Sequence, residues 1–179
     1  MITENQLREH LKSRHMQVEL YSGVWFGEGV VVFGLWNLVG QLVGYQQYTP
    51  SAPKARCNDP REGRYYTYTS KPGGLGCVTA WGLETVVPGV PLLLCEGIFD
   101  ACRLHTIGVP ALAVLGSDPV HLHQWFSLFS QPVISVVQGD VAGQKLAKYG
   151  SCQILLPEGH DVGSLSEDSF LSIFNQFTR

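Results

Sequence analysis

The feature that most constrains the fold is a series of four short apolar runs in the second half of the chain. The runs are LLLCEG (92–97), VPALAVLGS (109–117), VISVVQGD (133–140) and CQILLPEG (152–159). Segments with helical spacing or helix-capping residues follow them, at 98–107, 119–130, 142–150 and 166–177. Because apolar and polar residues do not alternate within the runs, the pattern is typical of strands that are buried on both faces. We therefore expect an α/β region with a parallel sheet flanked by helices.

The first half of the chain has a different pattern of residues. Residues 2–15 predict a short helix with Thr3 as its N-cap. Residues 24–48 are rich in β-branched and aromatic side chains interrupted by glycine, which predicts two or three antiparallel strands, and residues 63–70 predict another. KPGGLG (71–76) reads as a flexible break.

The segment VVPGVP (86–91) is interpreted as the seam between these two regions. The sequence thus predicts a small α+β subdomain over residues 1–88 and an α/β domain over residues 89–179.

Composition and charge exclude several classes of protein. Apolar residues make up 45% of the chain and charged residues 15%, so it can form a packed core and is not disordered throughout. The net charge of −3 excludes a uniformly basic nucleic-acid coat. No apolar run reaches the roughly 18 residues that span a membrane. The polar N-terminus and five widely spaced cysteines favour a cytoplasmic protein with no membrane partner.

Acidic or amide side chains follow nearly every predicted strand of the α/β region. Glu96 follows the first, Gln138 and Asp140 follow the third, and Asp161 follows the fourth. Because ligands of open parallel sheets gather beyond the carboxyl ends of the strands, we expect these oxygens to form a Mg²⁺ site at one edge. The alternative is structural, since acids in such positions also cap helices, as Asp118 could.

These residues resemble the Toprim domain of bacterial DNA primases, topoisomerases and related nucleases. CEGIFDACRLHTIGVPALAVLGS is similar to the first primase block, QGDVAGQKLA to the Asp-x-Asp signature block, and LPEGHDVGSL to a later acidic block. Weaker likeness extends upstream to LVGYQQY, GRYYTYTSKPGG and AWGLETV, so that about residues 24–175 are covered.

The resemblance implies a Toprim domain preceded by a small α+β subdomain, and the activity of a DNA primase. Such a nucleotidyltransferase would join nucleoside triphosphates into a short RNA primer on a single-stranded DNA template, using Mg²⁺ or Mn²⁺. Glu96 and Asp140 would be catalytic, and Glu96, Asp140, Asp161 and Gln138 would hold the metal. A replicative helicase or another replication protein is an expected partner, and a bare core favours a phage or mobile-element protein.

Two departures from the family pattern keep other functions open. Gln138 stands where the family has the first acid of Asp-x-Asp, and Tyr48 stands where it has a strand arginine. Both favour an alternative in which the chain keeps the fold and binds nucleic acid or a replication partner without chemistry. A Toprim nuclease, which uses the same acids, is a third possibility.

A local basic stretch in the first half could contact nucleic acid. Residues 54–71 carry five Lys or Arg against two acids, with tyrosines interleaved. Cations for phosphates and flat rings for bases are what single-strand binding uses, although a solvated loop and a half-buried strand explain the same residues. The candidate nucleic-acid and nucleotide contacts are Arg64, Lys71, Arg61, Arg56, Lys54, Tyr66 and Lys145. Arg64 is the strongest of them, because the family resemblance places a basic residue there.

Overall fold

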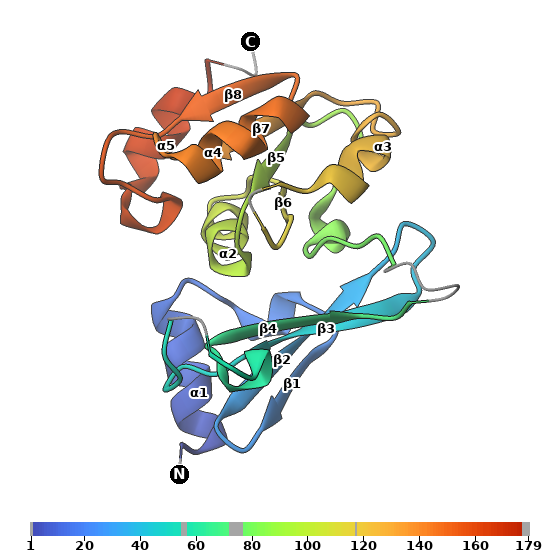
Figure 1. Ribbon diagram of the computed structural model, residues 1–179. Coiled ribbons are helices and arrows are strands. Elements are labelled where there is room, and N and C mark those ends of the chain that lie inside the picture. Colours follow the sequence, from blue (N-terminus) through green and yellow to red (C-terminus); the bar gives the residue numbers. More distant parts are fainter. Residues whose placement is uncertain (1, 55–56, 72–76, 117, 177–179) are drawn as a thin grey trace. The chain divides into compact units, whose positions relative to one another are not determined.

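The computed structural model describes residues 2–54, 57–71, 77–116 and 118–176. The chain forms two compact units, Met1–Thr79 and Ala80–Arg179 (Figure 1). The sequence places this boundary at 88/89 instead. Residues 80–88 group with the second unit, in which Trp81 forms a β-bridge with Ala113. The predicted break over 72–76 lies outside the described residues.

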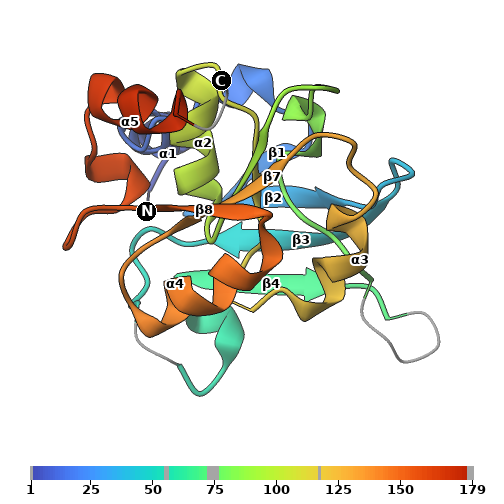
Figure 2. The ribbon, with the colours of Figure 1, turned by 90° about the horizontal axis from the view of Figure 1, so that it is seen from above.

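The first unit combines one α-helix with an antiparallel sheet. Helix α1 (Glu4–Ser13) begins with the predicted Thr3 cap, which forms a capping box with Gln6. The strands are β1 (Val24–Gly27), β2 (Val30–Trp36), β3 (Leu42–Tyr48) and β4 (Tyr65–Thr69). Figure 2 shows them side by side in the order β1-β2-β3-β4. The predicted antiparallel strands are therefore confirmed, as three strands in 24–48 and one in 63–70.

The second unit contains the predicted parallel sheet. Its strands are β5 (Leu92–Cys95), β6 (Ala111–Ala113), β7 (Val133–Val137) and β8 (Cys152–Leu155), in the order β6-β5-β7-β8. All three pairings are parallel. Every residue of β5, β6 and β7 is buried, which explains the unalternating apolar runs. The polar Ser135 is accommodated because its hydroxyl donates to the Leu146 carbonyl at 2.9 Å.

Helices flank this sheet, and the predicted α/β class is confirmed (Figure 1). The α-helices of the second unit are α2 (Ile98–Thr106), α3 (His123–Phe126), α4 (Val141–Leu146) and α5 (Glu167–Phe174). Short 3₁₀ turns occur at Val18–Leu20, Pro60–Glu62, Leu83–Thr85, Val120–Leu122, Ala147–Tyr149 and Val162–Ser164. Across the described ranges, no helix has the length and hydrophobicity that crossing a bilayer requires.

The predicted helix over 119–130 is wrong in its length. The structure has a 3₁₀ turn from Val120 followed by a single α-helical turn that ends at Phe126. The Ser127 hydroxyl donates to the Gln124 carbonyl at 2.8 Å, and local side-chain bonds of this kind compete with helix continuation. Pro132 lies shortly beyond and starts the extended approach to β7.

Candidate active site

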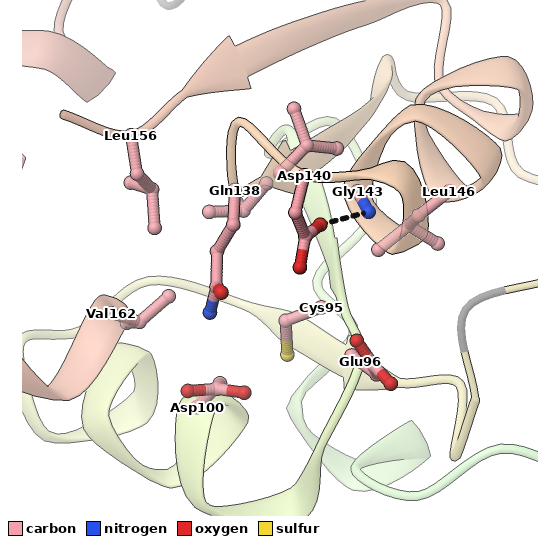
Figure 3. A pocket seen from close by; sticks show the side chains of 11 residues that line it. Cys95, Glu96, Asp100, Gln138, Asp140, Gly143, Leu146, Leu156 and Val162 are labelled. Carbon is pink, nitrogen blue, oxygen red and sulfur yellow. Dashed lines mark hydrogen bonds between the residues drawn. The ribbon is translucent and has the colours of Figure 1, made fainter. Parts of the chain in front are cut away.

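A small pocket opens at the carboxyl ends of β5 and β7, which are neighbours in the sheet (Figure 3). Its volume is about 20 Å³, which is room for one water molecule or a small ion. Apolar side chains and Cys95 form its walls, and four oxygen-bearing side chains complete it: Glu96, Asp100, Gln138 and Asp140. Sequence reasoning placed Glu96, Gln138 and Asp140 together at this edge, and all three line the pocket.

Glu96 directly follows the buried strand β5, and its carboxyl group reaches solvent. Its backbone carbonyl accepts a hydrogen bond from the Leu115 N–H at 2.9 Å, which fixes the end of β5 to the segment after β6. Leu115 adopts the left-handed conformation with φ 62°, which is uncommon for a non-glycine residue and costs conformational energy. The position of Glu96 is thus held by a strained neighbouring backbone.

The electrostatics of the pocket favour a bound cation. Partial burial raises the pKa of the Glu96 carboxyl above its ordinary value, and the nearby Asp140 carboxylate raises it further. Burial, followed by the nearby charge of Asp100, also raises the pKa of the Cys95 thiol well above its usual range. Cys95 is therefore a neutral thiol in the pocket wall, and the carboxylates repel one another until a positive charge neutralises them.

Asp140 has a structural as well as a chemical position. It is the N-cap of α4, and its Oδ1 accepts a hydrogen bond from the Gly143 N–H at 2.7 Å (Figure 3). Gly143 in turn packs so closely against the Gln138 backbone that a Cβ there would lie 2.1 Å from the Gln138 carbonyl oxygen. The sequence QGDVAG therefore folds into one tight loop that aims Gln138 and Asp140 at the same space.

Asp100 is the pocket residue that sequence reasoning left out of the candidate site. It lies in the first turn of α2. Its carboxylate points into the pocket from the side opposite Gln138 and Asp140 (Figure 3). The spacing Glu-x-x-x-Asp was the available signal, because it places the acid one helical turn beyond the strand end.

Asp161 does not line this pocket, although its neighbour Val162 does. Asp161 caps the turn Val162–Ser164, and its Oδ1 accepts from the Ser164 N–H at 2.8 Å. Asp118, the other acid considered as a cap, instead accepts a hydrogen bond from the Tyr149 hydroxyl at 2.5 Å. This bond raises the pKa of Tyr149 to about 12. Capping of a helix or turn, the structural role considered for these acids, therefore applies to Asp140 and Asp161.

The predicted nucleic-acid contacts that the structure describes belong to both units. The guanidinium group of Arg61 lies 5.9 Å from the centre of the Tyr66 ring, whereas Arg64 Nε donates to the Ala52 carbonyl at 2.9 Å and is half-buried. Lys54 and Lys71 are exposed in the first unit, and Lys145 is exposed on α4 in the second. Arg56 lies outside the described residues.

Several solved primase structures have a similar fold. The primase of Aquifex aeolicus, in a structure of its zinc-binding and RNA polymerase domains, matches with a TM-score of 0.65 and 17% identity over 97% of this chain and 56% of that one. A DnaG primase catalytic domain bound to single-stranded DNA matches with a TM-score of 0.61 and 18% identity over 97% and 61%. The primase fragment of the bacteriophage T7 primase-helicase gives 0.57 and 13% over 82% and 62%. The chain has the fold of a primase catalytic core.

The expected resemblance to primase catalytic cores is thus confirmed at the level of the fold. No protein-family model matches the sequence, and no curated protein matches it either. The chain spans about three fifths of the length of the solved primase chains that it matches. In the primase-type fold the acids Glu96 and Asp140 follow adjacent parallel strands, β5 and β7, as the motif comparison implies.

Proposed function

We propose that the chain is the catalytic core of a DNA primase, which joins ribonucleotides into a short RNA primer on single-stranded DNA with Mg²⁺ or Mn²⁺. The observation that carries this proposal is the convergence of Glu96 and Asp140 on one pocket within a primase-type fold. Sequence identity to the solved primases is only 13% to 20%. The support for the proposed activity therefore comes from the fold and the pocket, and not from overall sequence similarity.

The pocket chemistry fits a small divalent cation. Among the described residues, no group of three or more His, Cys, Asp or Glu side chains could hold a metal ion alone. Mg²⁺ does not need such a group, because it commonly binds one or two carboxylates and completes its shell with water and substrate phosphates. When bound, the ion would neutralise charge on the reacting phosphoryl group. Glu96 and Asp140 would hold it, and the Gln138 amide oxygen would assist.

The remaining residues have roles in binding and proton transfer. Glu96 would act as the central metal ligand or as the base that takes the proton of the attacking 3′-hydroxyl. Its raised pKa belongs to the carboxyl without a cation and suits the second role. Asp161 was also expected to hold the metal, but its Oδ1 caps Ser164 and it does not line the pocket, so the proposal gives it no direct contact with the cation there. Arg64 and Lys71 would contact phosphates, with Arg56, Arg61, Lys54 and Lys145 as further contacts.

The expected partners follow from the same comparison. One neighbour was solved bound to single-stranded DNA, and another belongs to a primase-helicase. We infer that this chain binds a single-stranded DNA template and nucleoside triphosphates, and that it works beside a replicative helicase.

Primer synthesis on a single-stranded template with labelled nucleoside triphosphates tests the proposed function. We expect short RNA products that require Mg²⁺ or Mn²⁺ and disappear in chelator. Shortening of the template without RNA products would assign the chain to the nucleases instead. Binding to DNA with neither reaction would assign it to the binding proteins and overturn the proposed activity.

A second candidate function is binding without catalysis, and Gln138 is the observation that favours it. This neutral amide lies on the pocket wall opposite Asp100, in a position where a carboxylate would add charge for the cation. An amide oxygen can ligate Mg²⁺, but it contributes less affinity than a carboxylate. The pocket of this chain is therefore expected to bind its cation weakly without the nucleotide.

Replacing Gln138 by Asp tests whether the Mg²⁺ site is weak or absent. We expect Gln138→Asp to lower the Kd for Mg²⁺ by about tenfold, which corresponds to roughly 1.4 kcal/mol from one added carboxylate. Calorimetric titration with Mg²⁺ measures it. Gln153→Asp is the matched control, because Gln153 is exposed on β8 and does not line the pocket. Equal Kd values for both variants would show that position 138 does not face the cation.

A further inference from the structure

The sheet of the first unit has two chemically different faces. Side chains of directly paired residues point to the same face, and successive residues along a strand point to opposite faces. One face carries the row Phe26, Val31, Tyr48 and Tyr65, which are paired across all four strands. Helix α1 covers this face, because His10 stacks on Tyr48 and bonds its hydroxyl at 2.7 Å, and Arg8 lies over the Phe26 ring.

The opposite face carries four aromatic side chains, which together we call the aromatic face: Trp25, Tyr45, Tyr66 and Tyr68. Tyr45 pairs with Tyr68 across β3 and β4, and their ring centres lie 5.4 Å apart. Tyr45 also meets the Tyr66 ring at 6.2 Å. Trp25 and Tyr68 remain 47% and 45% exposed, although large aromatic side chains usually bury most of their surface. The rings therefore contact one another and still present surface to a partner.

Gly34 makes this arrangement possible at the centre of the sheet. It pairs with Tyr45 on β3, and a Cβ at Gly34 would lie 3.1 Å from two carbons of the Trp25 indole. The indole thus lies across the glycine, between β1 and β3, and extends the row of tyrosines. The rings thus form one surface across β1, β3 and β4, with ring planes inclined by 61° between Tyr45 and Tyr66 and by 32° between Tyr45 and Tyr68. This surface lies on the side of the sheet opposite α1.

The charge beside the aromatic face points to a polyanion. Arg61 extends over the Tyr66 ring at 5.9 Å, so one cation belongs to the row itself. The segment 54–71, which contains β4, carries five cations and two acids in its sequence. Of these cations, Arg61 lies at the aromatic face, whereas Arg64 lies near His10 and Tyr48 on the side of α1. A protein partner would need no such excess of positive charge, whereas a single-stranded nucleic acid offers both bases for the rings and phosphates for the cations.

We propose that the aromatic face binds single-stranded DNA by base stacking, with Tyr66 and Tyr68 contacting successive bases and Arg61 contacting the backbone. This inference rests on the proposed function, because it specifies how the template is held. It extends the sequence-based expectation, which already included Tyr66 and Arg61, to Tyr68, Tyr45 and Trp25 on the same face of the sheet. The aromatic face reads no particular sequence, because every base has a π-face.

Fluorescence anisotropy with a labelled oligothymidine tests the proposal in chelator, where no metal-dependent chemistry occurs. We expect Tyr68→Ala and Tyr66→Ala each to weaken binding about 5- to 100-fold. Tyr68→Phe keeps the ring and should retain the affinity. Tyr65→Ala is the matched control, because Tyr65 is 43% exposed on the same strand but points to the other face, where it stacks with Tyr48.

The outcomes separate this inference from the proposed function. If the unaltered protein binds no oligothymidine, both fall. If it binds, and the Tyr65 variant loses as much affinity as the Tyr68 variant, the aromatic face is not the binding surface while primer synthesis stays a separate question. If Tyr68→Ala changes the oligomeric state in sedimentation without changing DNA affinity, the face is an interface between copies of the chain, and the proposal is overturned.

Discussion

Replacing Glu96 by Gln is expected to abolish primer synthesis while making the protein slightly more stable. The amide keeps the size of the side chain but removes the negative charge that would hold the cation and the basic oxygen that would take a proton. Loss of a positioned acid–base group alone costs about 10²- to 10⁴-fold in rate. Primer yield over time measures the loss, and Glu158→Gln, an exposed acid outside the pocket, is the matched control.

The gain in stability follows from the direction of the pKa shift. Burial and the Asp140 carboxylate raise the pKa of Glu96 above its ordinary value, so the folded state holds this proton more tightly than the unfolded state. The charged form therefore destabilises the fold, and stability is lost as pH rises from 4.5 through the raised pKa. Solvent screens an exposed carboxylate, so the gain in Glu96→Gln should not exceed about 0.5 kcal/mol.

Thermal melts in chelator at pH 4 and pH 7.5 show whether this explanation holds. The Glu96→Gln protein should melt with the unaltered protein at the lower pH and slightly above it at the higher pH. Added Mg²⁺ should raise the Tm of the unaltered protein only, since a ligand stabilises the state that binds it. A variant that still responds to Mg²⁺, or still makes primers at more than a tenth of the normal rate, would remove Glu96 from the site.

The α/β unit could be predicted from the sequence because strands that are buried on both faces consist almost entirely of apolar residues. LLLC and VISVV contain almost no polar residue, and both are fully buried strands. The convergence of Glu96 and Asp140 was predictable for the same reason, since both follow such strands. The role of each carboxylate could not be predicted from the sequence, because helix capping and metal binding require the same residue type at the same position.

The positions of Asp161 and of the tyrosines of β3 and β4 could be predicted only in part from the sequence. Asp161 follows β8, at the edge of the sheet, and the local turn Val162–Ser164 engages its carboxylate. The alternation of Tyr65, Tyr66 and Tyr68 shows from the sequence alone which two rings share a face. It does not show that Tyr45 completes the row, because the register between β3 and β4 depends on the loop over 49–64. Pairing over such a distance is a property of the whole fold.

Replacing Gly143 by Ala is expected to have the largest effect on stability. An added Cβ would lie 2.1 Å from the Gln138 carbonyl oxygen and 2.8 Å from the Gln138 nitrogen, and both are backbone atoms that cannot rotate away. The Asp140 cap on the Gly143 N–H also prevents α4 from shifting without losing that bond. Overpacking of this kind costs about 1–3 kcal/mol, which lowers the Tm of a chain of this size by roughly 2–12 °C.

Gly139→Ala is the matched control for this substitution. Gly139 lies in the same loop, but no atom lies within 4 Å of the position where its Cβ would be, so we expect an unchanged Tm. Since the loop aims both Gln138 and Asp140 at the pocket, Gly143→Ala should also weaken Mg²⁺ binding, whereas Gly139→Ala should not. Two variants with equal Tm and equal Mg²⁺ affinity would mean that the close approach of Gly143 to Gln138 does not shape the pocket.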